Sequence, residues 1–279
     1  LAKPLVITLP CVLLLLDVWP LRRWYPPSVA DAAGRRAAAR LVWEKAPLFL
    51  VSALMAFQTW RAAAAGGGLN REDPVLLWER CSVPAMGYAA YLWKLVWPTN
   101  LAVIYPYTHA FPLWAVTASL VALVLVTVLV CRYAGRIPWL TVGWLWYVGT
   151  LAPMSGIIQV GPQWMADRFA YLPFLGLYIV VTWSASALLA PGRCRGRLGV
   201  ALAGVVLAAL ALQTMRQIQH WQDSRTLLGH ALAVTENNFL ACNNLGVYAA
   251  SQGRYSEAVV HYRRAIDIRP RFASPHTNL

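Results

Sequence analysis

Long apolar runs separated by short arginine-rich loops constrain the fold of this chain more than any other feature. Leu113–Cys131 carries no charged residue and is followed closely by Arg132 and Arg136. About 20 apolar residues in helical form cross the ~30 Å hydrocarbon core of a bilayer. Charged residues make up 13% of the chain and hydrophobic residues 59%, whereas soluble domains have roughly 25% charged residues. The sequence therefore predicts an all-α fold that begins with a polytopic transmembrane helical domain.

Six spans are expected in this membrane domain, residues 1–213. Their approximate ranges are 4–19, 48–65, 113–131, 139–160, 171–190 and 198–212. An excess of Lys and Arg marks the cytoplasmic side of a membrane protein. That excess occurs in Leu21–Pro47, in the loop after Cys131 and in Arg193–Arg197. These loops fall on one side each time, so the loop Gly161–Ala170 and the chain after the sixth span are expected on the outer side.

The stretch 83–97 does not fit this alternation as a full crossing. It has only 15 residues, and the segment Pro98–Pro112 after it is rich in prolines and aromatic residues, which rules out a regular span there. The neighbouring spans end and begin on the outer side. We therefore expect 83–97 to be a re-entrant or surface-lying helix on the outer face. Asp17, at the end of the first span, is expected to pair with Arg22 or Arg23 at the headgroups.

The composition changes to that of a soluble protein after Thr214, and residues 214–279 are expected to form a solenoid of tetratricopeptide repeats. The range 239–272 fits one helix–turn–helix repeat of about 34 residues. Residues 221–238 match the end of a preceding repeat, and 273–279 the start of a following one. Such arrays bind proteins, so an acceptor or partner protein is expected here. The positions that carry the repeat pattern are Leu245, Gly246, Ala249, Gly253, Tyr255, Ala258, Tyr262, Ala265 and Pro270.

Several other classes of function receive no support from the sequence. The net charge of +13 comes from arginines in loops between apolar runs, a membrane pattern, so we expect no nucleic-acid partner. The five cysteines contain no CxxC motif, and the five histidines show no ligand spacing. Scattered Cys and His of this kind predict neither a metal site nor a disulfide. No cofactor is expected.

A polar island between two apolar runs, Gly161–Pro173, is the candidate functional site. Ionisable groups beside hydrocarbon are costly, so they tend to be paired or functional. Arg and Lys beside aromatic rings suit an isoprenyl-linked phosphate, because a guanidinium binds phosphate well. The alternative is a structural Asp–Arg pair within an aromatic belt. The candidate residues of the island and of the outer-face segments before it are Asp167, Arg168, Gln159, Gln163, Lys94, Asn100, Tyr105, Tyr107 and His109.

Four stretches, in this order, resemble one known family. They are LAKPLVITLPCVLLLLDVWPLRR, LWKLVWPTNLAVIYPY, GWLWYVGTLAPMSGIIQVGPQWMADRFAYLP and the repeat region that follows. The chain is similar over nearly all its length to the TPR-bearing transmembrane O-mannosyltransferase-like proteins and their bacterial relatives.

This resemblance implies a glycosyltransferase that takes sugar from a polyprenyl-phosphate carrier on the outer face and uses its repeats to present acceptor protein. It also implies the inner membrane of a bacterium, with the repeats on the periplasmic side. The catalytic acid of such enzymes lies in the first outer loop, which would precede Leu1, so no catalytic residue is named. Asp167 then has a donor-site or structural role. The chain is expected to be a piece of a longer protein.

Two rival hypotheses remain at this point. The protein could be a non-catalytic, membrane-anchored repeat scaffold that assembles envelope proteins. It could also transport a lipid-linked sugar, although a transporter would carry polar groups deep in its spans and only Gln58 qualifies. Acidic residues in the loop after the first span of the intact protein would favour the enzyme over the scaffold.

Overall fold

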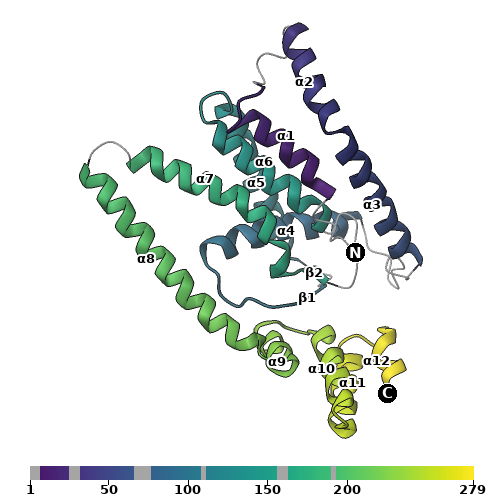
Figure 1. Cartoon of the computed structure of the whole chain (residues 1–279). Helices are drawn as coiled ribbons and strands as arrows, with labels where there is room; N and C mark the ends of the chain where they lie inside the picture. Colours follow the sequence, from purple (N-terminus) through teal and green to yellow (C-terminus); the bar gives the residue numbers. More distant parts are fainter. Residues whose placement is uncertain (1–6, 25–31, 66–76, 108–110, 156–162, 190–192) are drawn as a thin grey trace. The chain divides into compact units, whose positions relative to one another are not determined.

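The computed structural model describes residues 7–24, 32–65, 77–107, 111–155, 163–189 and 193–279. These residues fold almost wholly as α-helices, which confirms the all-α prediction (Figure 1). The helices of the N-terminal part are α1 Leu9–Val18, α2 Ala32–Glu44, α3 Ala46–Ala65, α4 Leu77–Val96, α5 Leu113–Tyr133, α6 Pro138–Leu151 and α7 Tyr171–Leu189. Those of the C-terminal part are α8 Arg193–Ile218, α9 Ser224–Val234, α10 Phe239–Ser251, α11 Tyr255–Ile268 and α12 Ala273–Asn278.

Apolar helices long enough to cross a bilayer identify the chain as a membrane protein. By length and composition, three described helices qualify: α5, α7 and the stretch Gly196–Trp221, which consists of most of α8 and the 3-10 turn after it. The pair α2–α3 would add a fourth span if its two bent halves count as one. The helices at the predicted spans 4–19 and 139–160 are shorter in the described residues, and the total of six spans stays a prediction.

Two of the predicted helices differ from their expected ranges for a visible reason. The helix predicted over 139–160 ends at Leu151, and the chain continues in the short 3-10 helix Ala152–Met154, where Pro153 has no N–H to donate to a continuing helix. The helix predicted over 83–97 starts earlier, at Leu77, and continues through Pro84 to Val96.

The chain forms two compact units. The first unit holds Leu1–Leu95, Ala110–Gly161 and Phe169–Leu188. The second holds Val96–His109, Pro162–Arg168 and Leu189–Leu279. The second unit therefore combines two loops that precede α7 in the sequence with the last long helix and the repeats.

Within the first unit, α6 and α7 run antiparallel in close contact. Trp139 Nε1 donates to Ser184 Oγ at 3.3 Å, and Trp146 Nε1 donates to the Leu172 carbonyl at 2.9 Å. Between these bonds the helices cross at Gly143 of α6 and Gly176 of α7. A Cβ added to either glycine would lie 2.4 Å from the carbonyl oxygen of the other. Small residues allow this approach of two membrane helices.

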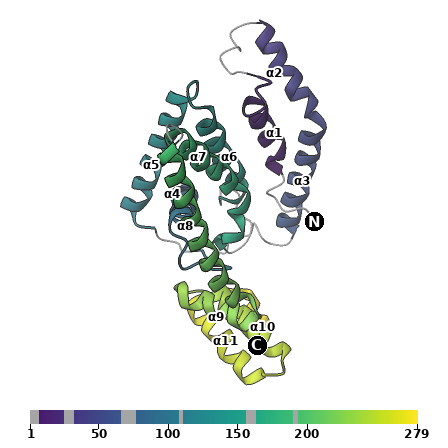
Figure 2. The same ribbon diagram turned by 60° about the vertical axis from the view of Figure 1, so that its left-hand side comes forward.

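A buried ion-pair cluster joins α1 to the junction of α2 and α3. Lys45 separates these two helices, which bend by 52° there (Figure 2). Its ammonium contacts Asp17 Oδ2 at 2.5 Å, and Arg23 contacts Asp17 Oδ1 at 3.0 Å and Glu44 at 2.8 Å. Asp17 is 2% exposed and Lys45 7% exposed. The expected Asp17–Arg23 pair is therefore present, and a lysine predicted only as a basic loop residue completes it.

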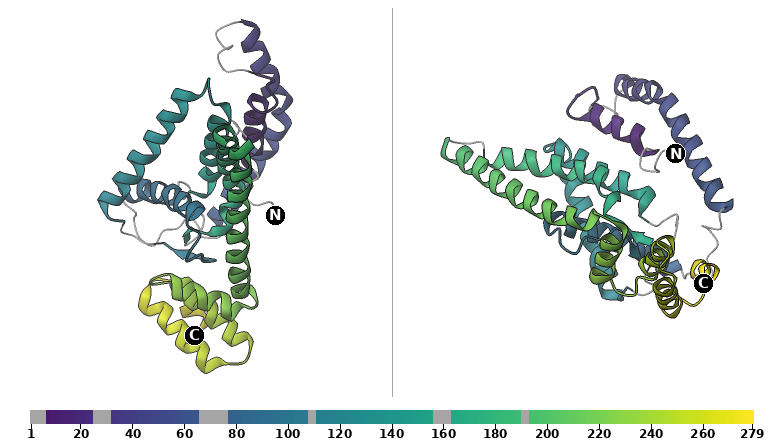
Figure 3. Two further views of the ribbon diagram at one scale, coloured as in Figure 1. Left: turned by 90° about the vertical axis from the view of Figure 1, so that its left-hand side faces the viewer. Right: turned by 60° about the horizontal axis from the view of Figure 1, so that its bottom comes forward.

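Within the second unit, α8 ends at Ile218 and is followed by the 3-10 turn Gln219–Trp221 and then by the repeat helices (Figure 3). Asp223 caps α9 in a capping box with Thr226. Gly253, at φ +74°, makes the turn between α10 and α11, a conformation that favours glycine. Gly246 of α10 leaves room for the ring of Tyr262 on α11, since a Cβ would meet that ring at 2.5 Å. The repeat positions buried in this core are Leu245, Ala249, Ala258, Tyr262 and Ala265.

Candidate functional site

Two loops of the second unit form one small folded module. The strand β1, Tyr105–Pro106, pairs antiparallel with β2, Gln163–Met165, with Tyr105 opposite Met165. We call residues 98–107 and 163–168 the loop module. Tyr105, Tyr107, Met165 and Ala166 are all buried. The polar island and the proline-rich segment, predicted only to share a face of the membrane, are therefore hydrogen-bonded to each other.

Asp167 fastens the proline-rich segment through one carboxylate oxygen. Its Oδ2 accepts from the Ala102 N–H at 2.7 Å and from the Tyr105 hydroxyl at 3.0 Å. The same hydroxyl lies 3.0 Å from the Asn100 carbonyl, and Asn100 has φ +52°, a left-handed conformation that Asn tolerates better than most residues. Asp167 thus holds a tight turn in place.

Arg168, the residue after Asp167, also bonds to the proline-rich segment. Its Nη1 donates to the Val103 carbonyl at 2.8 Å, and its Nη2 lies 3.5 Å from Gln163 Oε1. The guanidinium is therefore half-buried beside backbone and amide oxygens, and its bond to Gln163 is at the long limit for a hydrogen bond. The predicted Asp167 and Arg168 are therefore both bonded to the backbone of the proline-rich segment.

Side chains of α8, α9 and α10 contact three further carbonyls of this segment. The Gln213 amide donates to Pro98 O at 3.0 Å, and Gln217 donates to Leu101 O at 3.4 Å. His230 Nε2 lies 3.1 Å from Leu101 O, and the Asn238 amide donates to Ile104 O at 3.1 Å. The side chain of Ile104 also packs against the buried cluster of Phe239, Leu240, Cys242 and Ala265. The loop module is thus bound to α8, α9 and α10 through its backbone.

The imidazole of His230, which contacts the Leu101 carbonyl, also stacks on a second histidine and has a lowered pKa. The His220 and His230 rings stack with centroids 3.7 Å apart and planes 6° from parallel. Burial, and then the facing His220, lower the pKa of His230, while the bond to the Leu101 carbonyl opposes this. A neutral His230 that donates from Nε2 fits this arrangement, since two stacked cations would repel each other.

The remaining predicted site residues lie elsewhere. Lys94 is in the last turn of α4 and belongs to the first unit. Gln159 and His109 lie outside the described residues. The structure therefore brings together Gln163, Asp167, Arg168 and Tyr105, with Asn100 in the turn beneath them. Gln213, Gln217, His230 and Asn238 were not predicted, because an isolated amide or imidazole on a helix gives no sequence signal for a contact more than 100 positions away.

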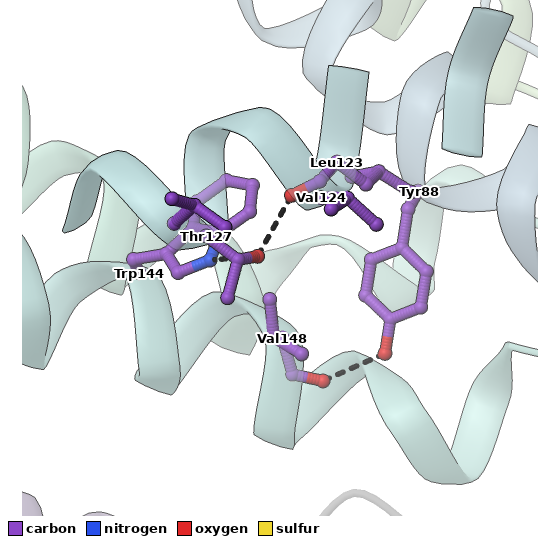
Figure 4. Close-up of a pocket in the computed structure, with 7 residues that line it drawn as sticks. Tyr88, Leu123, Val124, Thr127, Trp144 and Val148 are labelled. Atoms are coloured by element: carbon purple, nitrogen blue, oxygen red, sulfur yellow. Dashed lines mark hydrogen bonds between the residues drawn. The ribbon is translucent and has the colours of Figure 1, made fainter. Parts of the chain in front are cut away.

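An apolar groove lies within the first unit, between α4, α5 and α6 (Figure 4). Its volume is about 260 Å³. The polar atoms beside it are already bonded: the Tyr88 hydroxyl donates to the Val148 carbonyl at 2.7 Å, and Trp144 Nε1 donates to Thr127 Oγ1 at 3.0 Å. A ligand here would meet hydrocarbon and aromatic surface. The lining residues are Tyr88, Leu123, Val124, Thr127, Val128, Trp144 and Val148.

Metal ligands do not gather in the parts of the chain that the structure describes. No group of three or more His, Cys, Asp or Glu side chains suited to a metal ion is found among those residues.

Comparisons with known proteins agree with this architecture. The tetratricopeptide repeat family matches residues 239–272. The chain is 35% identical over 126 residues to the protein O-mannosyl-transferase Tmtc2 of Drosophila melanogaster, covering 45% of this chain and 13% of that protein. It is 25% identical over 258 residues to the human protein O-mannosyl-transferase TMTC1, covering 91% of this chain and 26% of that protein. No solved structure matches.

These matches confirm the resemblance drawn from the sequence and the presence of a tetratricopeptide repeat. The chain spans about an eighth and about a quarter of the length of these two relatives, 13% and 26%. Both relatives are animal proteins, so a bacterial inner membrane stays a prediction from the sequence.

Proposed function

We propose that the protein of which this chain is a part transfers a sugar, of the mannose type, from a polyprenyl-phosphate carrier to hydroxyl groups of exported proteins. The observation that carries the proposal is the similarity over 91% of the chain to a relative named as a protein O-mannosyl-transferase. The repeat supports it, because tetratricopeptide repeats bind proteins and would present the acceptor on the same, outer side of the membrane.

The loop module is the proposed donor-phosphate site, with Arg168 as its cation. A charge-assisted bond from a guanidinium to a phosphate oxygen is roughly twice as strong as a bond between neutral groups. A phosphate would therefore displace the amide oxygen of Gln163, now 3.5 Å from Nη2, while the bond to Val103 keeps the side chain in place. Positive charge at this position would stabilise the leaving phosphate during transfer.

The apolar groove of the first unit is not proposed as the phosphate site. Its polar neighbours, the Tyr88 hydroxyl and the Trp144 indole N–H, are bonded within the protein. A phosphate would have no polar partner there, so the groove suits an apolar chain.

The test is a transfer assay on the full-length protein in membranes, with radiolabelled polyprenyl-phosphate mannose as donor and extracted exported proteins as acceptor. We expect Arg168→Ala to reduce transfer by about 100-fold, the scale seen when one charge-stabilising donor is removed, and Arg168→Lys to restore part of it. Arg225→Ala, which removes an exposed guanidinium on α9, is the matched control and should transfer normally. Equal transfer by Arg168→Ala and the control would remove Arg168 from the mechanism.

A non-catalytic scaffold is the second candidate function. It is favoured by the engagement of Asp167 and Arg168 with the backbone of residues 102 and 103, which is what a structural role requires. The same assay separates the two. Absence of labelled protein with several donor sugars, together with capture of exported proteins by the repeats, would support the scaffold and contradict the transferase.

A further inference from the structure

Side chains contact five of the seven backbone carbonyls from Pro98 to Ile104 in the proline-rich segment of the loop module. Two of these carbonyls are contacted by side chains of the loop module itself. The Tyr105 hydroxyl lies within hydrogen-bond distance of the Asn100 carbonyl, and Arg168 donates to the Val103 carbonyl. Side chains of α8, α9 and α10 take the carbonyls of Pro98, Leu101 and Ile104. The segment Pro98–Ile104 is in neither a helix nor a strand, so its backbone groups need side chains or water as partners, and its path depends on both sets.

Asn238 has two separate roles at the start of α10. Its Oδ1 accepts from the Ala241 N–H at 3.0 Å and caps the helix. Its Nδ2 donates to the Ile104 carbonyl at 3.1 Å and to Thr235 Oγ1 at 2.8 Å. The residue is 1% exposed, so water cannot replace the bond to Ile104. One side chain thus links the first turn of the full repeat to the segment that Asp167 and Arg168 hold from the other side.

We propose that Asn238 is a positioning residue that fixes the loop module to the repeats. The repeats and the donor-phosphate site then move as one body, so a protein bound by the repeats meets the donor at a set distance. This inference rests on the proposed function for the meaning of that distance. The attachment itself depends only on the contacts of Asn238 and on the packing of Ile104 against α10 and α11.

Two variants separate the attachment from the helix cap. Asn238→Asp and Asn238→Ser both keep a good capping acceptor, but aspartate has no N–H and serine is too short to reach Ile104. The matched control is Asp223→Asn, which exchanges acid and amide at the cap of α9, where Asn caps as well as Asp. All four proteins are compared by hydrogen exchange, read by mass spectrometry on the full-length protein in lipid nanodiscs.

We expect exchange of the amides of residues 100–107 to rise about tenfold in both Asn238 variants, because each leaves a buried carbonyl unpaired. Exchange within α11 should not change, and the control should match the wild type throughout. Unchanged exchange of 100–107 would overturn the proposal. A parallel rise in α11 would overturn it as well, since Asn238 would then stabilise the repeat and not the loop.

Transfer kinetics on the same variants test the functional meaning. Loss of positioning predicts a lower kcat for transfer with an unchanged KM for the acceptor, because the repeats still bind it. An unchanged kcat despite faster loop exchange would overturn the positioning role in transfer. If the wild type transfers no sugar but the exchange result holds, the proposed function fails and the attachment through Asn238 stands.

Discussion

The crossing of α6 and α7 at Gly143 and Gly176 gives a sharp test of the packing of the first unit. In Gly143→Ala the new Cβ would lie 2.4 Å from the Gly176 carbonyl oxygen and 2.5 Å from a methyl group of Val180. Ordinary contact begins at 3.4 Å, so the helices would have to separate by about 1 Å, and dispersion contacts along the interface would weaken. The obstructing atom is backbone, which cannot rotate away.

The size of the effect follows from two opposing terms. Alanine stabilises a helix interior by about 0.5–1 kcal/mol over glycine, whereas overpacking a tight interface costs about 1–3 kcal/mol. We expect Gly143→Ala to lower the free energy of unfolding by about 1–2 kcal/mol as the balance of these terms. Gly149→Ala on the same helix is the matched control, because its Cβ would meet nothing within 4 Å. It should be neutral or slightly stabilising.

The assay is thermal unfolding of the full-length protein in detergent, followed by size-exclusion chromatography after heating. The expected order of midpoint temperature is Gly149→Ala equal to or above wild type, and Gly143→Ala below both. The Trp146 indole, bonded to the Leu172 carbonyl across the same interface, should report the separation as a change in fluorescence. If Gly143→Ala unfolds at the same temperature as Gly149→Ala, the close crossing is refuted.

Two further predictions concern ionisable groups. Lys45→Met should destabilise the first unit by about 3–5 kcal/mol, because the buried Asp17 loses its ammonium partner, and adding Asp17→Asn should recover most of the loss. Thermal unfolding checks this, and a single variant as stable as the wild type would contradict it. The lowered pKa of His230 means that folding favours its neutral form. The free energy of unfolding of the second unit should be largest above the ordinary pKa of about 6.5 and should decrease as pH falls through the lower folded value. Hydrogen exchange in that unit, corrected for its intrinsic pH dependence, measures this, and it should lose the pH effect in His230→Gln.

The features predicted well from the sequence have a local cause. Apolar runs form helices whatever they contact, and the repeat carries its own packing code in Gly246, Tyr262 and the buried alanines. The polar island is visible in the sequence as a short polar stretch between two apolar runs, and its role as a site stays a prediction. The alternation of basic loops predicted that the island and the proline-rich segment lie on the same face of the membrane. In the structure, β1 of the proline-rich segment pairs with β2 of the island, with Tyr105 opposite Met165.

The features not predicted arise from contacts between distant residues. A strand of two residues such as Tyr105–Pro106 shows no alternating pattern, so only its partner reveals it. Lys45 stood among the basic loop residues, and its burial depends on Asp17 of another helix. Gln217, His230 and Asn238 contact backbone carbonyls, and a carbonyl is the same in every residue. Nothing in the sequence of the segment could therefore indicate which side chains would bind it.

The packing of Ile104 against the first full repeat bears on how such a repeat array can be separated from its membrane anchor. The sequence suggests a cut after residue 213, where the composition becomes that of a soluble protein. A repeat region released there would lose Ile104 from its apolar cluster of Phe239, Leu240, Cys242 and Ala265, and it would leave the amide of Asn238 without its carbonyl. The surface uncovered by the loss of Ile104 would be apolar, which favours aggregation. A soluble version would need a replacement for Ile104, grafted at the end of the array that now rests on the loop.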